Sequence, residues 1–188
     1  LNARFFGVKE TGGKVEVLVE RVLDASTVLA QVRASKSPPP GTRMRLADAF
    51  DVMVGERAGE FFTLHFPSDA IALIDAHGSL PLPPYIAHEA GQQDEQRYQT
   101  LYASPRSGFA ASAAPTAGLH FSQDLLEDLK KMDIEFCHVG LEVGLGTFQP
   151  LREEQLQSGL LHEERFDMPE NTWNSLQKAR QLGRRVVA

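Results

Sequence analysis

Hydrophobic and polar residues alternate in short runs over the first 66 positions of the chain. In one run Val15, Val17 and Val19 alternate with polar residues, so one face of a strand would be buried and the other wetted. Strands are expected over residues 3–10, 15–20, 28–32, 43–47, 50–57 and 60–66. Such closely spaced strands, with little helix between them, predict a small antiparallel β-barrel or sandwich.

Turn residues separate these runs. Gly12 and Gly13 suit a tight hairpin between the first two strands, because both residues can adopt positive φ. The prolines at 38–40 cannot continue a sheet ladder, because proline lacks a backbone N–H. Near residue 68 the alternation ends. Ser68 is expected to cap a short helix that Gly78 ends.

The second half alternates helix and strand. Ser122 is expected to cap a helix with one apolar stripe, and Pro169 to open another helix that Gly183 ends. Strands are expected over residues 134–143 and 184–188. This order predicts a layered α/β domain. The proline-rich connector before residue 85 places the domain boundary there, with residues 1–84 in the small β-barrel domain and residues 85–188 in the α/β domain.

Composition narrows the function classes. The 188 residues carry a net charge of -6, which argues against a protein whose main task is to neutralise many phosphates. Local RNA-binding patches stay possible at two basic stretches, residues 33–45 and 178–185, although solvated surface charge is the simpler interpretation. Cys137 is the only cysteine, so no internal disulfide forms, and a reducing cytoplasm is expected. No apolar run approaches the roughly 20 residues that span a bilayer.

Three segments carry candidate chemistry. Residues 113–121 combine small residues, proline and glycine before a helix, so a ligand could approach the backbone there, next to His120. Residues 140–150 run from a strand into Gly-Leu-Gly-Thr-Phe, where glycines allow close backbone approach. The third segment places His162 beside two carboxylates, which favours hydrogen bonding or acid–base work over metal binding. For each segment, a plain turn or a structural histidine remains the alternative interpretation.

Five motifs occur in order along the chain, at residues 5–17, 80–86, 97–102, 113–121 and 143–150. With them the sequence resembles the S-adenosylmethionine:tRNA ribosyltransferase-isomerase family of queuosine biosynthesis over essentially its whole length. The resemblance implies an α/β core domain with an inserted small antiparallel β-barrel. It further implies that the beginning and end of the core are absent, so this chain alone is expected to be inactive.

The resemblance implies a reaction in which S-adenosylmethionine is the ribosyl donor and 7-aminomethyl-7-deazaguanine in tRNA is the acceptor. The ribosyl moiety is transferred and isomerised to give epoxyqueuosine, and adenine and methionine are released. S-adenosylmethionine is then a substrate, and neither a cofactor nor a metal is expected. The partners implied are this tRNA and the donor. A cytoplasmic monomer without membrane contact is expected.

The resemblance implies site residues at the positions that match the motifs of the family. The catalytic candidates are His120, Glu142 and His162. The substrate-binding candidates are Tyr85, Arg97, Tyr98, Pro115, Thr116, Ala117, Gly118, Gly144, Gly146, Thr147 and Phe148. The glycine- and alanine-rich residues would line the donor pocket, while the tyrosines and Arg97 would contact donor or tRNA.

The sequence departs from the family pattern at two places. Glu142 stands where the family usually has histidine, and it could act as a base or counter-charge. Near His162 the usual pattern is His-x-Met-His-Ser-Glu, and Leu160 and Leu161 here leave it without its first histidine. A non-catalytic RNA-binding or scaffold fragment is the alternative. A metal hydrolase using the three catalytic candidates is disfavoured, because no ligand spacing supports it.

Overall fold

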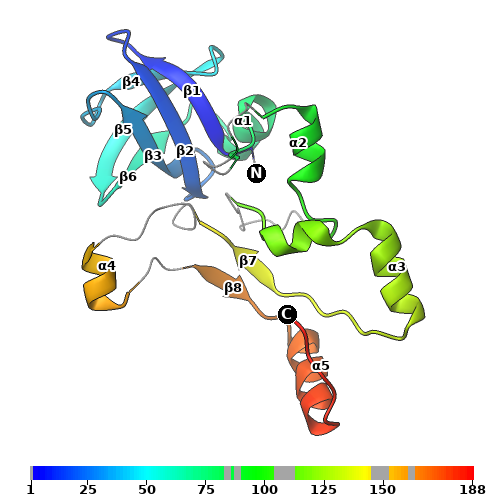
Figure 1. The fold of residues 1–188 in the computed structure, drawn as a ribbon. Helices are drawn as coiled ribbons and strands as arrows, with labels where there is room; N and C mark the ends of the chain where they lie inside the picture. The colour runs from blue at the N-terminus through cyan, green and yellow to red at the C-terminus, as the bar shows by residue number, and fades with distance from the viewer. Residues whose placement is uncertain (1, 83–85, 87–89, 104–112, 145–152, 161–163) are drawn as a thin grey trace.

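The first part of the chain is a closed antiparallel β-barrel (Figure 1). The computed structural model describes residues 2–82, 86, 90–103, 113–144, 153–160 and 164–188. The barrel strands follow the spatial order β1-β2-β3-β6-β5-β4. Their bounds are β1 Arg4–Lys9, β2 Lys14–Val22, β3 Thr27–Ala34, β4 Arg43–Leu46, β5 Phe50–Ala58 and β6 Phe61–His65. The predicted small antiparallel barrel is confirmed, and each of the six strands predicted within residues 3–66 coincides closely with an observed one.

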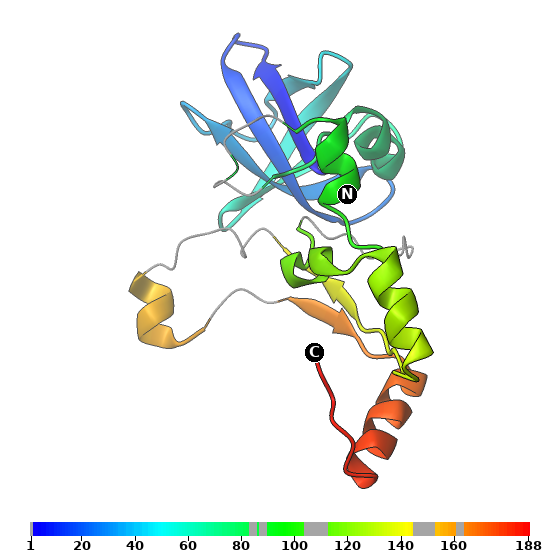
Figure 2. The same cartoon turned by 45° about the vertical axis from the view of Figure 1, so that its right-hand side comes forward.

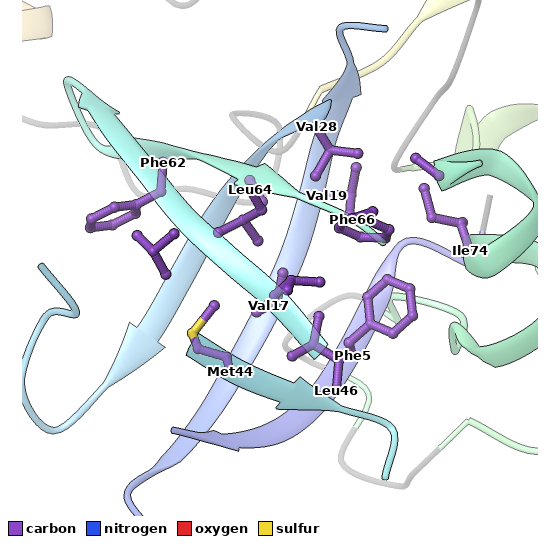
Figure 3. Close-up of a cluster of buried hydrophobic side chains, with 14 of the residues drawn as sticks. Phe5, Val17, Val19, Val28, Met44, Leu46, Phe62, Leu64, Phe66 and Ile74 are labelled. Carbon is purple, nitrogen blue, oxygen red and sulfur yellow. The ribbon is translucent and has the colours of Figure 1, made fainter. Parts of the chain in front are cut away.

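Alternate residues of the strands fill the barrel. Phe5, Val17, Leu46 and Leu64 are almost completely buried, and they point into the interior (Figure 3). Each such side chain contributes roughly 1.5–3 kcal/mol by leaving water. Phe5 also meets the ring of Phe50 edge-on, with 5.8 Å between centroids. The period of two that predicted the strands is therefore the period of the core.

The turn between β1 and β2 is less symmetric than expected. Gly12 has φ +82°, while Gly13 is not among the glycines with positive φ. The N–H of Gly12 donates to the Lys9 carbonyl at 2.8 Å, and the N–H of Lys9 donates to the Gly13 carbonyl at 2.8 Å. A loop of this length needs only one residue in the left-handed region.

One helix closes an end of the barrel. The helix α1, Ala70–His77, buries Ala70 and Ile74 in the same cluster as the barrel residues. Its N-cap is Asp69, whose carboxylate accepts from the N–H of Ala72 at 2.8 Å. The prediction of Ser68 as cap was wrong by one residue, because the carboxylate at the next position satisfies the same free N–H groups. Gly78 ends the helix as predicted.

The second part contains short helices and a two-stranded antiparallel sheet beneath the barrel (Figures 1 and 2). Its elements are α2 Gln92–Arg97, the 3-10 helix η1 Thr116–His120, α3 Gln123–Lys131, β7 Gly140–Glu142, α4 Glu153–Ser158, β8 Arg165–Asp167 and α5 Glu170–Gln181. Ser122 caps α3 as predicted, accepting from the N–H of Leu125 at 3.2 Å. Pro169 is the N-cap of α5, and Gly183, with φ +64°, follows its end.

Of the two strands predicted in this part, one is confirmed only over its C-terminal residues and the other is wrong. Of residues 134–143, only Gly140–Glu142 pairs with another strand, β8. The preceding residues are held instead by α5, because the hydroxyl of Thr172 donates to the His138 carbonyl at 2.7 Å. Residues 184–188 form no strand either. A β-prone run becomes a strand only where a neighbour accepts its backbone hydrogen bonds, and the described residues supply none here.

Within the described residues, no helix is both long enough and apolar enough to cross a membrane.

Removing a core side chain from the barrel should destabilise it. Leu64→Ala should lower the free energy of unfolding by about 2–5 kcal/mol, because the cavity sits between paired strands. Denaturant unfolding followed by circular dichroism measures this loss. The matched control is Leu156→Ala on α4, where leucine is 67% exposed, and its cost should stay within about 0.5 kcal/mol. Equal losses would contradict the assigned core.

Asp24 should make the β2–β3 turn sensitive to acid. Its carboxylate accepts from the N–H groups of Ser26 at 2.9 Å and Thr27 at 2.8 Å. The backbone hydrogen bond from Ser26, followed by the side-chain hydrogen bond from Thr27, lowers the pKa of Asp24 below 3.8. A lowered folded-state pKa means that the stabilisation is present above 3.8 and is lost as pH falls through the lowered value.

The melting temperature of Asp24→Ala should therefore lie below wild type near neutral pH, and the two should converge in acid. The exposed aspartate Asp75 on α1 supplies the control substitution Asp75→Ala. A difference between wild type and Asp24→Ala that does not change with pH would reject this role for the Asp24 carboxylate.

Candidate functional site

The small-residue segment forms a tight 3-10 turn that packs through Gly118. The Gly118 N–H donates to the Pro115 carbonyl at 2.8 Å, and its own carbonyl accepts from Phe121 at 3.2 Å. Gly118 is buried, and a Cβ there would overlap the Tyr102 hydroxyl and lie 2.9 Å from the Thr100 methyl. Only glycine lets the turn approach this tyrosine so closely.

The other predicted residues of this turn face outward. Pro115, Thr116, Ala117 and His120 are all exposed. Beneath them the Tyr102 ring lies 6.5 Å from that of Phe121 and 6.0 Å from that of His138, centroid to centroid. The turn therefore exposes small side chains and one imidazole to solvent. It is packed on a cluster of aromatic rings.

The end of β7 is held against the end of β2. Glu142 is only 7% exposed, and its Oε1 lies 3.5 Å from Nε of Arg21. Two residues further on, Gly144 is buried against the Glu20 carboxylate, and a Cβ at this glycine would overlap Oε1 of Glu20. The barrel thus places one carboxylate, Glu20, and one guanidinium, Arg21, against the end of this predicted ligand-binding strand.

A β-bulge in β2 explains why two adjacent residues of one strand reach the end of β7 and the residues that follow it. The register with β3 pairs Val19 with Ala30 but Arg21 with Leu29, which leaves Glu20 as the extra residue. A bulge bends a strand and re-aims its side chains. Without it, strict alternation from Val19 would turn Arg21 into the barrel interior, where an arginine would be buried without a partner.

The two selected segments lie on the same side of the molecule. In Figures 1 and 2 η1, in light green, lies beside β7, in yellow, on the side nearest the barrel. Residues 145–148 lie outside the described residues. Only residues 115–120 and 142–144 of the two segments are therefore placed relative to each other. Over that range the two segments lie side by side, and the cavity that they are predicted to share stays a prediction.

The remaining predicted residues are placed as follows. Arg97 ends α2 and is exposed, while Tyr98 is 8% exposed. Tyr85, Gly146, Thr147, Phe148 and His162 lie outside the described residues. Their predicted roles stay predictions. Among the residues that the structure describes, no three His, Cys, Asp or Glu side chains gather in a manner that could hold a metal ion.

Sequence reasoning missed the partners of these segments. Glu20 and Arg21 come from the barrel, and Tyr102 precedes η1 by more than ten residues, so no local motif joins them to the site. One signal was available. The apolar alternation through Val19 puts Arg21 at an inward position, and a charged residue there indicates a bulge.

Comparison with known proteins identifies the family. A family model described as queuosine biosynthesis protein matches residues 1–188. The chain belongs to this family. The family resemblance inferred from the five motifs is thereby confirmed.

The relatives are similar in sequence but longer. The chain is 59% identical over 188 residues to the S-adenosylmethionine:tRNA ribosyltransferase-isomerase of Herminiimonas arsenicoxydans, covering 100% of the chain and 54% of that protein. It is 55% identical to the protein of the same name from Burkholderia orbicola strain MC0-3, covering 100% of the chain and 52% of the relative. The chain therefore spans about half the length of the curated relatives it matches.

Among solved structures, the chain is similar to the S-adenosylmethionine tRNA ribosyltransferase of Thermotoga maritima. The two share 21% identity with a TM-score of 0.36, over 100% of this chain and 47% of that one. A score of this size does not establish a shared arrangement.

The Arg21–Glu142 pair should couple the barrel to β7. In a double-mutant cycle with Arg21→Met and Glu142→Gln, we expect a coupling free energy of about 0.5–3 kcal/mol, because the single changes leave a buried carboxylate or a partly buried guanidinium without its partner. Denaturant unfolding of the four proteins measures it. The exposed pair Lys131 and Asp128 on α3, 2.9 Å apart, is the control cycle and should give about 0.5 kcal/mol or less. Coupling no larger than this control would mean that the buried pair does not join the two parts.

Proposed function

We propose that the complete protein containing this chain transfers and isomerises the ribosyl moiety of S-adenosylmethionine onto 7-aminomethyl-7-deazaguanine in tRNA. The products would be epoxyqueuosine in the tRNA, adenine and methionine. The observation that carries the proposal is the family match over residues 1–188, together with 59% identity to a relative that bears this activity in its name. S-adenosylmethionine is a substrate in this proposal, and no cofactor or metal takes part.

The geometry of the described residues supports a donor site between η1 and the end of β7. The donor combines a sulfonium cation, a sugar and a purine, so its pocket needs nearby carboxylates and a wall with few bulky side chains. Pro115, Thr116 and Ala117 form such a wall, and Gly144 brings the backbone to the surface of Glu20. In our proposal residues 144–148 complete the same pocket.

The proposal divides the acid and base roles among three residues. Glu142 is engaged by Arg21, so we assign it the role of a counter-charge that positions the strand end rather than that of a proton carrier. His120 is exposed on the last turn of η1, where its imidazole could reach a bound donor and exchange a proton. His162 is retained as a second proton carrier on the strength of its sequence context.

The proposed architecture extends the observed one. We infer that residues 85–188 belong to a layered α/β core into which the barrel, residues 1–84, is inserted. Leu141 on β7, Phe166 on β8 and Trp173 on α5 are each half or more exposed, as expected for surfaces that further layers of such a core would cover. We further propose that the enzyme acts as a monomer in the cytoplasm, where an exposed free thiol such as Cys137 stays reduced.

Adenine release tests the function. The complete protein can be made by placing this chain in the matching segment of the Herminiimonas arsenicoxydans relative. It should release adenine from S-adenosylmethionine only when tRNA carrying the 7-aminomethyl-7-deazaguanine base is present, as followed by chromatography. Unmodified tRNA is the control for the acceptor, and this chain alone should be inactive. Absence of release with the modified tRNA would reject the enzyme and favour a non-catalytic RNA-binding role.

The same assay tests His120. His120→Ala in the complete protein should lower the rate by about 10²–10⁴-fold if the imidazole moves a proton. His65→Ala, which removes an exposed imidazole from the barrel, should leave the rate unchanged. A wild-type rate and donor affinity in His120→Ala would remove this histidine from the site.

A further inference from the structure

Five cationic side chains gather at the end of the barrel that carries the β1–β2 hairpin. This hairpin-end cluster consists of Lys9, Lys14, Arg33, Lys36 and Arg43. Backbone pairing brings them together from the ends of β1, β2, β3 and β4 and, for Lys36, from the bend that follows β3. The N–H of Glu10 donates to the Arg43 carbonyl at 3.1 Å, and Nζ of Lys9 donates to the Lys36 carbonyl at 3.0 Å.

The β2–β3 pairing completes the cluster. It sets Glu16 opposite Arg33, and Lys14 lies two residues before Glu16 at the start of β2. The cluster therefore spans four neighbouring strands at one end of the barrel, and its members are up to 34 positions apart in sequence.

The cluster keeps most of its positive charge. Lys14, Lys36 and Arg43 are exposed and make no ion pair among the described residues. Arg33 has a side chain that is 72% exposed, and it lies 4.0 Å from an oxygen of Glu16. The other oxygen of that carboxylate is bound by Arg4 at 2.8 Å, so one acid serves two arginines.

The chain as a whole carries a net charge of -6, so this concentration of cations is opposite in sign to its overall charge. Like charges on neighbouring strands repel one another and cost stability. A surface that accumulates them is thus better suited to meeting an anion than to stabilising the barrel.

The position of the cluster determines how long an anion must be to reach from β7 to the cluster. The hairpin end of β2 points away from β7, whereas Glu20 and Arg21, near the other end of β2, contact it (Figure 1). From Lys14 to Arg21 the strand rises by roughly 3.3 Å per residue, so the two ends are separated by about 23 Å. A molecule the size of S-adenosylmethionine cannot occupy both places. An elongated polyanion with one end at the β7 side can extend along the barrel to the cluster.

We propose that the hairpin-end cluster binds backbone phosphates of the tRNA stem while the modified base occupies the site beside β7. This inference rests on the proposed function, because it takes tRNA as the substrate. Lysine and arginine contacts to phosphate fix the register and orientation of a nucleic acid without reading its sequence. Double-stranded RNA is recognised largely by its shape and backbone, which suits an exposed cationic surface with no pocket of its own.

Salt-dependent RNA binding by this chain tests the cluster. Fluorescence anisotropy with a labelled, transcribed anticodon stem-loop gives the Kd at several KCl concentrations. The triple variant Lys14→Gln/Lys36→Gln/Arg43→Gln should bind about tenfold or more weakly than wild type. The slope of log Kd against log salt should fall by about 1 for each phosphate contact removed. All three side chains are exposed and their mutual repulsion is relieved, so the melting temperature should not fall below that of wild type.

Two further variants separate the cluster from net charge and from misfolding. Lys130→Gln/Lys131→Gln/Lys178→Gln removes the same charge from α3 and α5 and should keep wild-type affinity and slope. Lys14→Arg/Lys36→Arg/Arg43→Lys preserves every charge and should also bind as wild type. Equal weakening in the α3 and α5 control, unchanged binding in the cluster variant, or no binding by the wild-type chain would each overturn the proposal. Adenine release by the complete protein decides the proposed function independently, so the two can fail separately.

Discussion

The contact between the end of β2 and the end of β7 is the interaction on which the described arrangement depends. A single extra residue in β2, Glu20, bends the strand so that Glu20 and Arg21 both face β7 instead of alternating between the barrel interior and solvent. Arg21 then neutralises the buried Glu142, and Gly144 can approach Glu20 because it has no side chain. A bulge at the rim of a barrel thus determines which groups surround a loop about 120 positions further along the chain.

The barrel serves different purposes at its two ends. Near β7 it presents an acid and a base to a segment of small residues, which suits a compact cationic donor. At the hairpin end it presents unneutralised lysine and arginine side chains, which suit an extended anion. The rigid interior, filled by residues such as Val17 and Leu64, holds the two ends at a constant separation. In the proposed function, a large and flexible substrate would be positioned by two contacts rather than one, which would limit how the reacting base can be presented.

The carboxylate of Glu142 has a physical explanation in this arrangement. A carboxylate at the end of β7 would be costly to bury by itself, but Arg21 from the barrel offsets that cost. The residue that is tolerated at the end of β7 therefore depends on the residue that the barrel places opposite it. In contrast, η1 depends on contacts within the second part of the chain, where Gly118 lies against Tyr102 and the ring of that tyrosine lies between those of Phe121 and His138.

The sequence by itself determined the elements whose causes are local. Alternation of apolar residues defined all six barrel strands, and Ser122 marked the start of α3, because strand faces and helix caps depend on neighbours a few positions away. The five motifs were enough to indicate the family. Tertiary structure decided the rest. Residues 134–139 are β-prone yet are held by α5 through His138, and residues 184–188 find no strand partner among the described residues. The pairing of Arg21 with Glu142 and the gathering of the hairpin-end cluster arise only when the barrel closes, because they join positions that nothing in the local sequence relates.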